Sequence, residues 1–152
     1  MGISQEELDQ YVARMRSKFQ ALVEEAAALR GWNIVLCHGT GGELQMINSL
    51  GITRSCALVH DAISVTFFVP SRLTFDSVDE LPHHLATNML VRNDTSYFGH
   101  WCLEELDDKF TCTCMKREKI SDMDVETFWK SINGLFAECD NLEESIYRNL
   151  PG

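Results

Sequence analysis

The chain has no hydrophobic run near the roughly 20 residues that a membrane-spanning helix requires. Its first ten residues, MGISQEELDQ, are polar and acidic, whereas a secretory signal carries an apolar stretch at this place. Proline occurs only three times in 152 residues, and no linker, low-complexity stretch or internal repeat interrupts the sequence. These absences predict a single cytoplasmic domain, residues 1–152, that has no membrane partner.

Positive charge is also scarce. The sequence has 13 lysines and arginines against 23 aspartates and glutamates, which gives a net charge of −10. Its one basic cluster, KREK at residues 116–119, is short. An acidic surface repels the phosphate backbone of DNA and RNA. Nucleic acids are therefore not expected as partners.

The six cysteines lack the spacing of a metal site. There is no C-x-x-C pair, and only Cys112 and Cys114 lie close together in sequence. Structural zinc sites usually combine two such pairs. Without a secretory signal, the cysteines are expected to be thiols rather than disulfides. We therefore predict neither a metal nor a cofactor.

Residues 37–42, CHGTGG, allow three interpretations: a phosphate-binding loop, a nucleophile beside its base, or a turn after a strand. A Walker-type loop needs Lys and Ser or Thr after its last glycine, and this sequence has Glu43 there. Cys37 and His38 are adjacent, and adjacent residues of a strand point to opposite faces, so they cannot bond to each other. The sequence therefore favours a turn.

Three helices are expected. The first begins with a capping box formed by Ser4 and Glu7 and ends at Gly31. The second is expected over residues 79–92, and the third from Ser121 onward. Hydrophobic residues recur every three or four positions in the first and third helices, as they do where one helix face is buried. A surplus on these stripes would leave an exposed apolar patch, which usually marks a partner site.

Short runs rich in β-branched and aromatic residues separate these helices. WNIVLC, GELQMI, SCALV and ISVTFFV predict a meander of about three strands that ends at Pro70. YFGHWCLEE and KFTCTCMK predict an antiparallel hairpin, with one face formed by Trp101, Leu103, Phe110, Cys112 and Cys114. The order α-β-β-β-α-β-β-α predicts an α+β domain with three helices and an antiparallel sheet of about five strands.

Most of the chain resembles a known family, most specifically in its second half, whereas the N-terminal half matches by element order. The resemblance rests on LPHHLATNMLVRN, YFGHWCLEE, FTCTC and ISDMDVETFWKSINGLFAECDNLEESI, which are similar to the class I type III secretion chaperone fold and the YbjN-like family. It implies a non-enzymatic protein that holds an extended segment of a client protein and can form a homodimer. The chain departs from the family in GTGGELQMINSLG and in Pro82-His83-His84. The resemblance brings no catalytic residues.

We therefore predict a non-enzymatic protein-binding module, chaperone-like or adaptor-like, that shields an extended segment of a client. Its candidate partner-binding residues are Leu85, Met89, Phe67 and Val69. The alternative is a small enzyme or a redox or metal protein that uses Cys37, His38 or the Cys112–Cys114 pair. A bacterial regulatory domain that acts only through contact is a third hypothesis.

Overall fold

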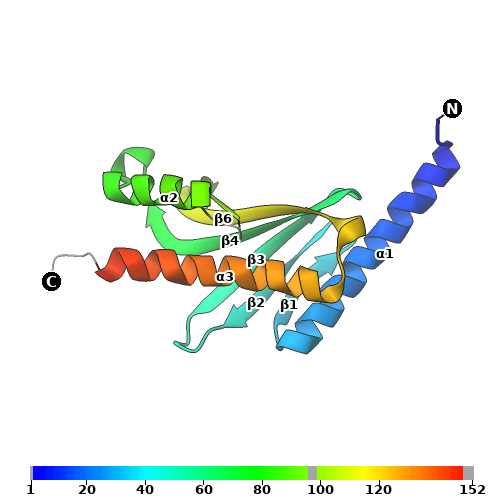
Figure 1. The fold of residues 1–152 in the computed structure, drawn as a ribbon, viewed down its shortest axis with the longest axis horizontal. Helices are drawn as coiled ribbons and strands as arrows, with labels where there is room; N and C mark the ends of the chain where they lie inside the picture. The colour runs from blue at the N-terminus through cyan, green and yellow to red at the C-terminus, as the bar shows by residue number, and fades with distance from the viewer. Residues whose placement is uncertain (1, 96–98, 149–152) are drawn as a thin grey trace. The chain divides into compact units, whose positions relative to one another are not determined.

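The computed structural model describes residues 2–95 and 99–148 and has the α+β architecture that the sequence predicts (Figure 1). Its elements in chain order are α1 (Gln5–Arg30), β1 (Asn33–His38), β2 (Gly41–Ile47), β3 (Thr53–His60), β4 (Ser64–Phe75), α2 (His83–Thr95), β5 (His100–Leu106), β6 (Lys109–Lys119) and α3 (Val125–Arg148). The prediction of three α-helices is confirmed for this part of the chain. None of its helices is long and apolar enough to span a membrane.

The sheet is antiparallel and has six strands in the order β1-β2-β3-β4-β6-β5. The expectation of about five strands was wrong, because the region before α2 forms four strands rather than three. The strand β4 also continues past Pro70 as far as Phe75. Proline removes one backbone donor, and that loss alone does not end a strand whose side chains alternate between buried and half-buried positions.

The bounds of α1 follow the predicted local signals. The Ser4 side chain accepts a hydrogen bond from the backbone N–H of Glu7, and the Glu7 side chain accepts one from the backbone N–H of Ser4. At the other end Gly31 adopts a left-handed conformation, with φ of 69°. Both predicted boundaries are confirmed.

The other two helices begin about four residues later than predicted. A 3-10 turn at Val78–Glu80 precedes α2, and another at Ile120–Asp122 precedes α3. The start of α3 has a local cap, because the backbone N–H of Thr127 donates to Asp124 Oδ1 at 2.7 Å and the Thr127 hydroxyl accepts from the Asp124 N–H at 3.0 Å. This reciprocal pair, rather than Ser121, sets the first turn.

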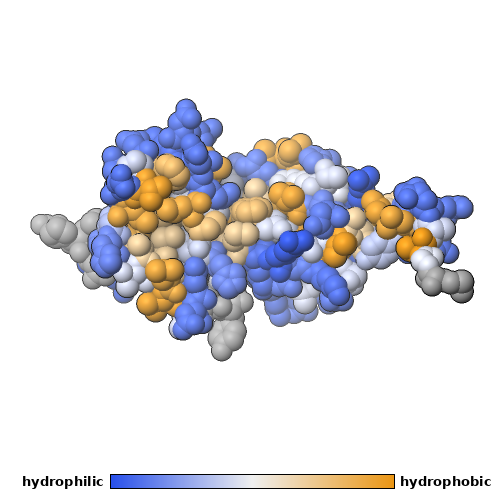
Figure 2. All heavy atoms as spheres, turned by 90° about the horizontal axis from the view of Figure 1, so that it is seen from above, coloured by the Kyte–Doolittle hydropathy of each residue, from blue (hydrophilic) through white to orange (hydrophobic). Residues whose placement is uncertain are grey.

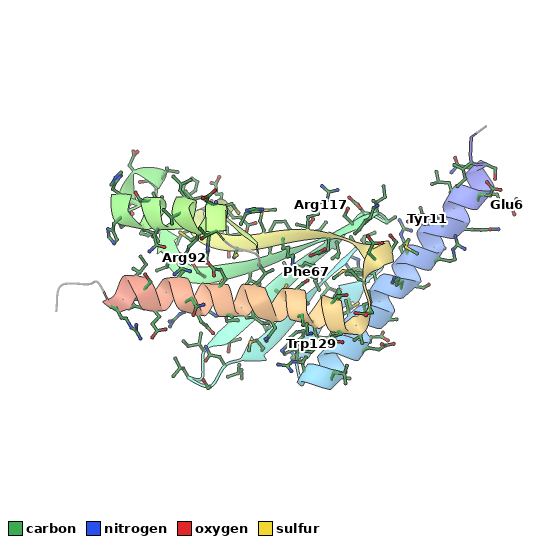
Figure 3. All side chains as sticks on the ribbon, in the orientation of Figure 1. Glu6, Tyr11, Phe67, Arg92, Arg117 and Trp129 are labelled. Atoms are coloured by element: carbon green, nitrogen blue, oxygen red, sulfur yellow. The ribbon has the colours of Figure 1, made fainter. Side chains whose placement is uncertain are left out.

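The chain divides into two compact units, residues 1–67 with 117–130, and residues 68–116 with 131–152. In the first unit, the ring of Phe19 on α1 stacks on His60 of β3 with centroids 4.8 Å apart. Phe67 of β4, which is labelled in Figure 3, meets Phe128 of α3 edge to face, with centroids 5.4 Å apart. These rings form the centre of its core, because all four residues are buried.

In the second unit, the β5–β6 hairpin has the predicted register. Trp101 pairs with Cys114 and Leu103 with Cys112, so these side chains share a face as expected. Asp107 and Asp108 form the turn with positive φ, a conformation that aspartate tolerates better than most residues. The Cys112–Cys114 pair is buried and belongs to the core.

A buried carboxylate connects three elements of the second unit. Glu138 of α3 accepts hydrogen bonds from Arg92 Nη1 of α2 at 2.9 Å and from Trp101 Nε1 of β5 at 3.0 Å. Glu138 is buried, and a buried charge is tolerated when it is paired and hydrogen-bonded. The cluster therefore has a structural role.

We expect Arg92→Ala to lower the free energy of unfolding by about 3 kcal/mol, because Glu138 would keep its buried charge without its cationic partner. Chemical denaturation would measure the change. Arg148→Ala is the matched control, since its ion pair with Glu144 is exposed and such pairs contribute about 0.5 kcal/mol or less. Equal losses in the two variants would contradict the structural role of Glu138.

The CHGTGG segment is the turn of the β1–β2 hairpin, as favoured by the sequence. His38 pairs with Gly41, so Gly39 and Thr40 form the connection. A Cβ atom on Gly42 would lie 2.7 Å from the carbonyl oxygen of Leu36, which is too close for a side chain. The glycine at this position thus admits a close approach of two strand backbones.

Gly42→Ala should destabilise the protein by about 1–3 kcal/mol, since the added methyl group forces the backbone to move. Gly39→Ala serves as the control within the same turn. Its Cβ would meet only the side chain of Arg16 at 3.1–3.3 Å, and that flexible side chain can shift. Thermal unfolding would compare them, and an equally stable Gly42→Ala variant would refute the close-approach explanation.

Candidate functional site

The structure places all four predicted partner-binding residues in the core. The exposed fractions are 1% for Leu85, 6% for Met89, and 0% for both Phe67 and Val69. The prediction that these residues form an accessible surface was therefore wrong. Phe67 and Val69 lie on the buried side of the alternating strand β4, and Leu85 and Met89, four residues apart, lie on the buried face of α2.

The exposed apolar residues of α2 are on its other side. Leu90 and Val91 follow Met89 directly and are exposed. Hydrophobic side chains gather over α2 in the space-filling view (Figure 2). Two apolar residues on a helix that satisfies its own backbone hydrogen bonds make a small contact surface, so this pair is the weaker candidate.

The stronger candidate is the edge strand β1. Its residues Ile34, Val35 and Leu36 have exposed fractions of 38%, 47% and 53%. Because three consecutive side chains are exposed, the rest of the unit covers this edge strand only in part. Four of the six residues of β1 are apolar (three aliphatic side chains and Cys37), and none carries a formal charge when His38 is neutral.

The strand register identifies the face to which each residue belongs. Ile34 pairs with the fully buried Leu44, so it lies on the side of the sheet that forms the core. Leu36 pairs with Glu43 and lies on the opposite side. The pairing shifts between these two residues, which places a bulge at Val35.

β1 also leaves backbone groups available for pairing. It stands at one end of the strand order, and β2 is its only strand neighbour in the described part of the chain. The opposite edge strand, β5, differs in composition because it contains Glu104 and Glu105. Charged residues on edge strands disfavour pairing with another chain. The edge at β1 carries no such charge, although its bulge limits regular pairing.

A pocket of about 350 Å³ lies beside the beginning of β1. Its lining residues are Gly31, Asn33, Gln45, Met46, Ile47 and Thr53. All of them are uncharged, and all belong to the first unit. A pocket of this size and composition can accept an apolar or neutral polar side chain.

Acidic residues flank the edge. Glu43 is the partner of Leu36 in the sheet. The pKa of the Cys37 thiol is raised, mainly by burial and in second place by the carboxylate of Glu24 on α1. Both carboxylates therefore lie near the part of β1 that contains Leu36 and Cys37. A segment that pairs there with lysine or arginine beside its apolar residues would complement their charge.

Thiol chemistry finds little support in the environment of the cysteines. Burial raises the pKa of Cys112 to about 11 and that of Cys114 to about 12. Burial is also the main cause of the raised pKa of Cys37 and of Cys102. Because the thiolate is the nucleophile, each of these shifts reduces the reactive fraction at neutral pH.

The histidines do not complete a catalytic pair in the described residues. His38 Nδ1 lies 2.9 Å from Thr40 Oγ1, within the turn. His60 Nδ1 lies 2.9 Å from the carbonyl oxygen of Gly39, while its Nε2 is buried without a hydrogen-bond partner. No group of three or more potential metal ligands occurs in residues 2–95 and 99–148.

We expect the thiols of the folded protein to react with iodoacetamide more slowly than a cysteine in an unstructured peptide at pH 7. A raised pKa means that the thiolate fraction grows only as the pH rises toward the shifted value, so labelling should accelerate in the alkaline range and after unfolding. Mass spectrometry of labelled peptides would assign the rates. One cysteine that reacts faster than the peptide would contradict this expectation and favour the enzyme hypothesis.

Comparisons with family models, curated proteins and solved structures found no match to this chain. The resemblance to secretion chaperones and YbjN-like proteins therefore stays a prediction. The interaction site rests on the geometry of β1, which sequence reasoning did not select. The available signal was NIVLCH itself, an uncharged run in a chain of which 24% of the residues are charged.

Proposed function

We propose that this protein is a non-enzymatic binding module that captures an extended segment of another protein along β1. The observation that carries the proposal is the uncharged edge strand with three consecutive exposed aliphatic side chains. Addition of a strand to an exposed edge is a common mode of peptide recognition. In this mode, backbone hydrogen bonds supply affinity and alternate side chains supply specificity.

The captured segment would become a seventh strand beside β1. Its side chains would alternate between the side of Ile34 and the side of Leu36, so apolar residues on both sides would bury aliphatic surface. The uncharged pocket beside Asn33 could take one of them. Basic residues of the segment that lie beside Leu36 and Cys37 would complement the charges of Glu43 and Glu24.

Pairing with β1 would also shield the client segment from aggregation. A client segment that is apolar and unpaired before folding tends to aggregate, and pairing with β1 would occupy its backbone and side chains. The remaining surface carries the net charge of −10, which favours solubility of the complex. This combination supports a chaperone-like or adaptor-like role.

The test is affinity capture with a tagged wild-type chain and a Leu36→Lys variant from the cells that produce the protein. A lysine on an edge strand opposes strand addition, so a client that pairs with β1 should be enriched by the wild type and lost from the variant. Leu106→Lys on β5 is the matched control, because it places the same substitution at an exposed position of the other edge strand. The control should retain the client.

Hydrogen exchange would locate the bound segment. The backbone amides of β1 should become protected when the captured client is added, and those of β5 should remain unchanged. A client that binds all three chains equally, or that protects other elements and leaves β1 exchanging freely, would refute edge capture.

A further inference from the structure

The N-terminal half of α1 extends beyond the packed part of the first unit. Phe19 is the first buried residue of this helix, although the helix begins at Gln5. Residues 2–10 are all exposed. Figure 3 shows Glu6 near the start of α1, away from the strands of the unit. The first turns of this 26-residue helix thus present their side chains to the surroundings.

This half of α1 keeps the apolar stripe of the packed half. Leu8, Tyr11, Val12 and Met15 recur at spacings of three and four residues, which places them on one side of the helix. Leu8 is exposed, and the other three are half-buried. An apolar stripe on the unpacked part of a helix is the surface that a partner helix covers.

Charge changes sign along the same segment. Its three acidic residues are Glu6, Glu7 and Asp9, and its three basic residues are Arg14, Arg16 and Lys18. These charges cancel over residues 4–18, although the whole chain has a net charge of −10. The acids precede the bases, so the segment is negative at one end and positive at the other.

The two flanks of the stripe repeat this pattern. Glu7 and Arg14 are seven residues apart and lie on one flank, while Asp9 and Arg16 have the same separation on the other. Two such helices side by side in opposite directions place each acid near a base of the other helix. Two parallel helices would oppose like charges at both ends.

We propose that the N-terminal half of α1 pairs in an antiparallel manner with the same segment of a second copy of this chain. The apolar stripes form the contact, and Glu7 of each copy meets Arg14 of the other. The guanidinium of Arg14 lies 5.9 Å from the ring centroid of Tyr11, which places its charge beside the apolar stripe. Lys18 contributes less, since its Nζ already donates to the carbonyl oxygen of Ser121 at 3.0 Å.

The size of the contact predicts a weak dimer. The unpacked segment from Gln5 to Met15 is about 16 Å long at 1.5 Å per residue. Two helices of this length bury less surface than the roughly 1,200 Å² of a stable interface. Association should therefore depend on protein concentration, and it is independent of capture at β1.

Sedimentation velocity over about a hundredfold range of concentration would test the proposal. The wild type should show a shift from monomer to dimer. Arg14→Glu should weaken dimerisation by about tenfold, because the two-fold symmetry converts two attractive pairs into two repulsive ones. A wild type that stays monomeric throughout, or an Arg14→Glu variant that dimerises as well as the wild type, would overturn the proposal.

A charge exchange provides the sharper test. Glu7→Arg should also weaken self-association, whereas an equal mixture of the Glu7→Arg and Arg14→Glu chains should form a heterodimer. The double variant Glu7→Arg/Arg14→Glu should recover the homodimer, even though it lacks the capping box of Glu7. If recovery fails while circular dichroism shows unchanged helix content, the antiparallel pairing is wrong.

Glu6→Arg is the matched control for charge. Glu6 is adjacent to Glu7 in sequence but lies nearly opposite Leu8 on the helix, so it faces away from the stripe. The control changes the net charge by the same amount and should leave the dimer unaffected. An equal loss in Glu6→Arg and Glu7→Arg would attribute the effect to net charge and would refute the specific contact.

Discussion

The alternation of side chains along the strands is the constraint on which the first unit depends. In β3, the buried residues are Arg54, Cys56, Leu58 and His60, and the residues that separate them are exposed or half-buried. Rings from α1 and α3 occupy the closed side, where Phe19 stacks on His60 and Phe128 meets Phe67. On the other side, Val59 of β3 and Leu36 of β1 are exposed. The exposed position of Leu36 is therefore a consequence of the way this unit closes its core, since the register assigns Leu36 to the open side.

In the second unit, the pairing of buried charged side chains holds the elements in position. Helix α3 places two carboxylates in the interior, and each is held by groups from other elements. Glu143 accepts hydrogen bonds from the backbone N–H of Arg72 at 3.0 Å and from its Nε at 2.8 Å. Glu138 accepts bonds from Arg92 and Trp101. Such pairs fix the position of one element against another, because a shift would leave a buried charge without its partner.

Sequence reasoning succeeded where the determining interactions are local. The capping box at Ser4 and Glu7 and the end of α1 at Gly31 depend on residues a few positions apart. The same holds for the β5–β6 hairpin, in which the strand register decides which side chains share a face with Trp101. The prediction that the strand ends at Pro70 was wrong, because β4 continues to Phe75. The prediction of about three strands before α2 was also wrong, because WNIVLC, GELQMI, SCALV and ISVTFFV each contribute to a separate strand.

The candidate site was harder to predict, because it depends on strand order. NIVLCH has the composition of a central strand that is buried on both faces, and only its place at the end of the sheet makes it an exposed edge. The error at Leu85 and Met89 has a related cause. Periodicity identified the apolar face of α2 correctly. That face packs inside its own unit, so its residues are buried and not accessible to a partner.

Charge distribution connects the two proposed interactions. A chain with a net charge of −10 repels its own copies and non-specific acidic partners, so association has to occur where the local charge is neutral or self-complementary. The strand β1 is neutral, and residues 4–18 carry no net charge, with acidic residues at one end and basic residues at the other. A dimer formed through α1 would carry two β1 edges. A client with two suitable segments could then bind both edges and be held more firmly than by either one, provided that its linker spans them.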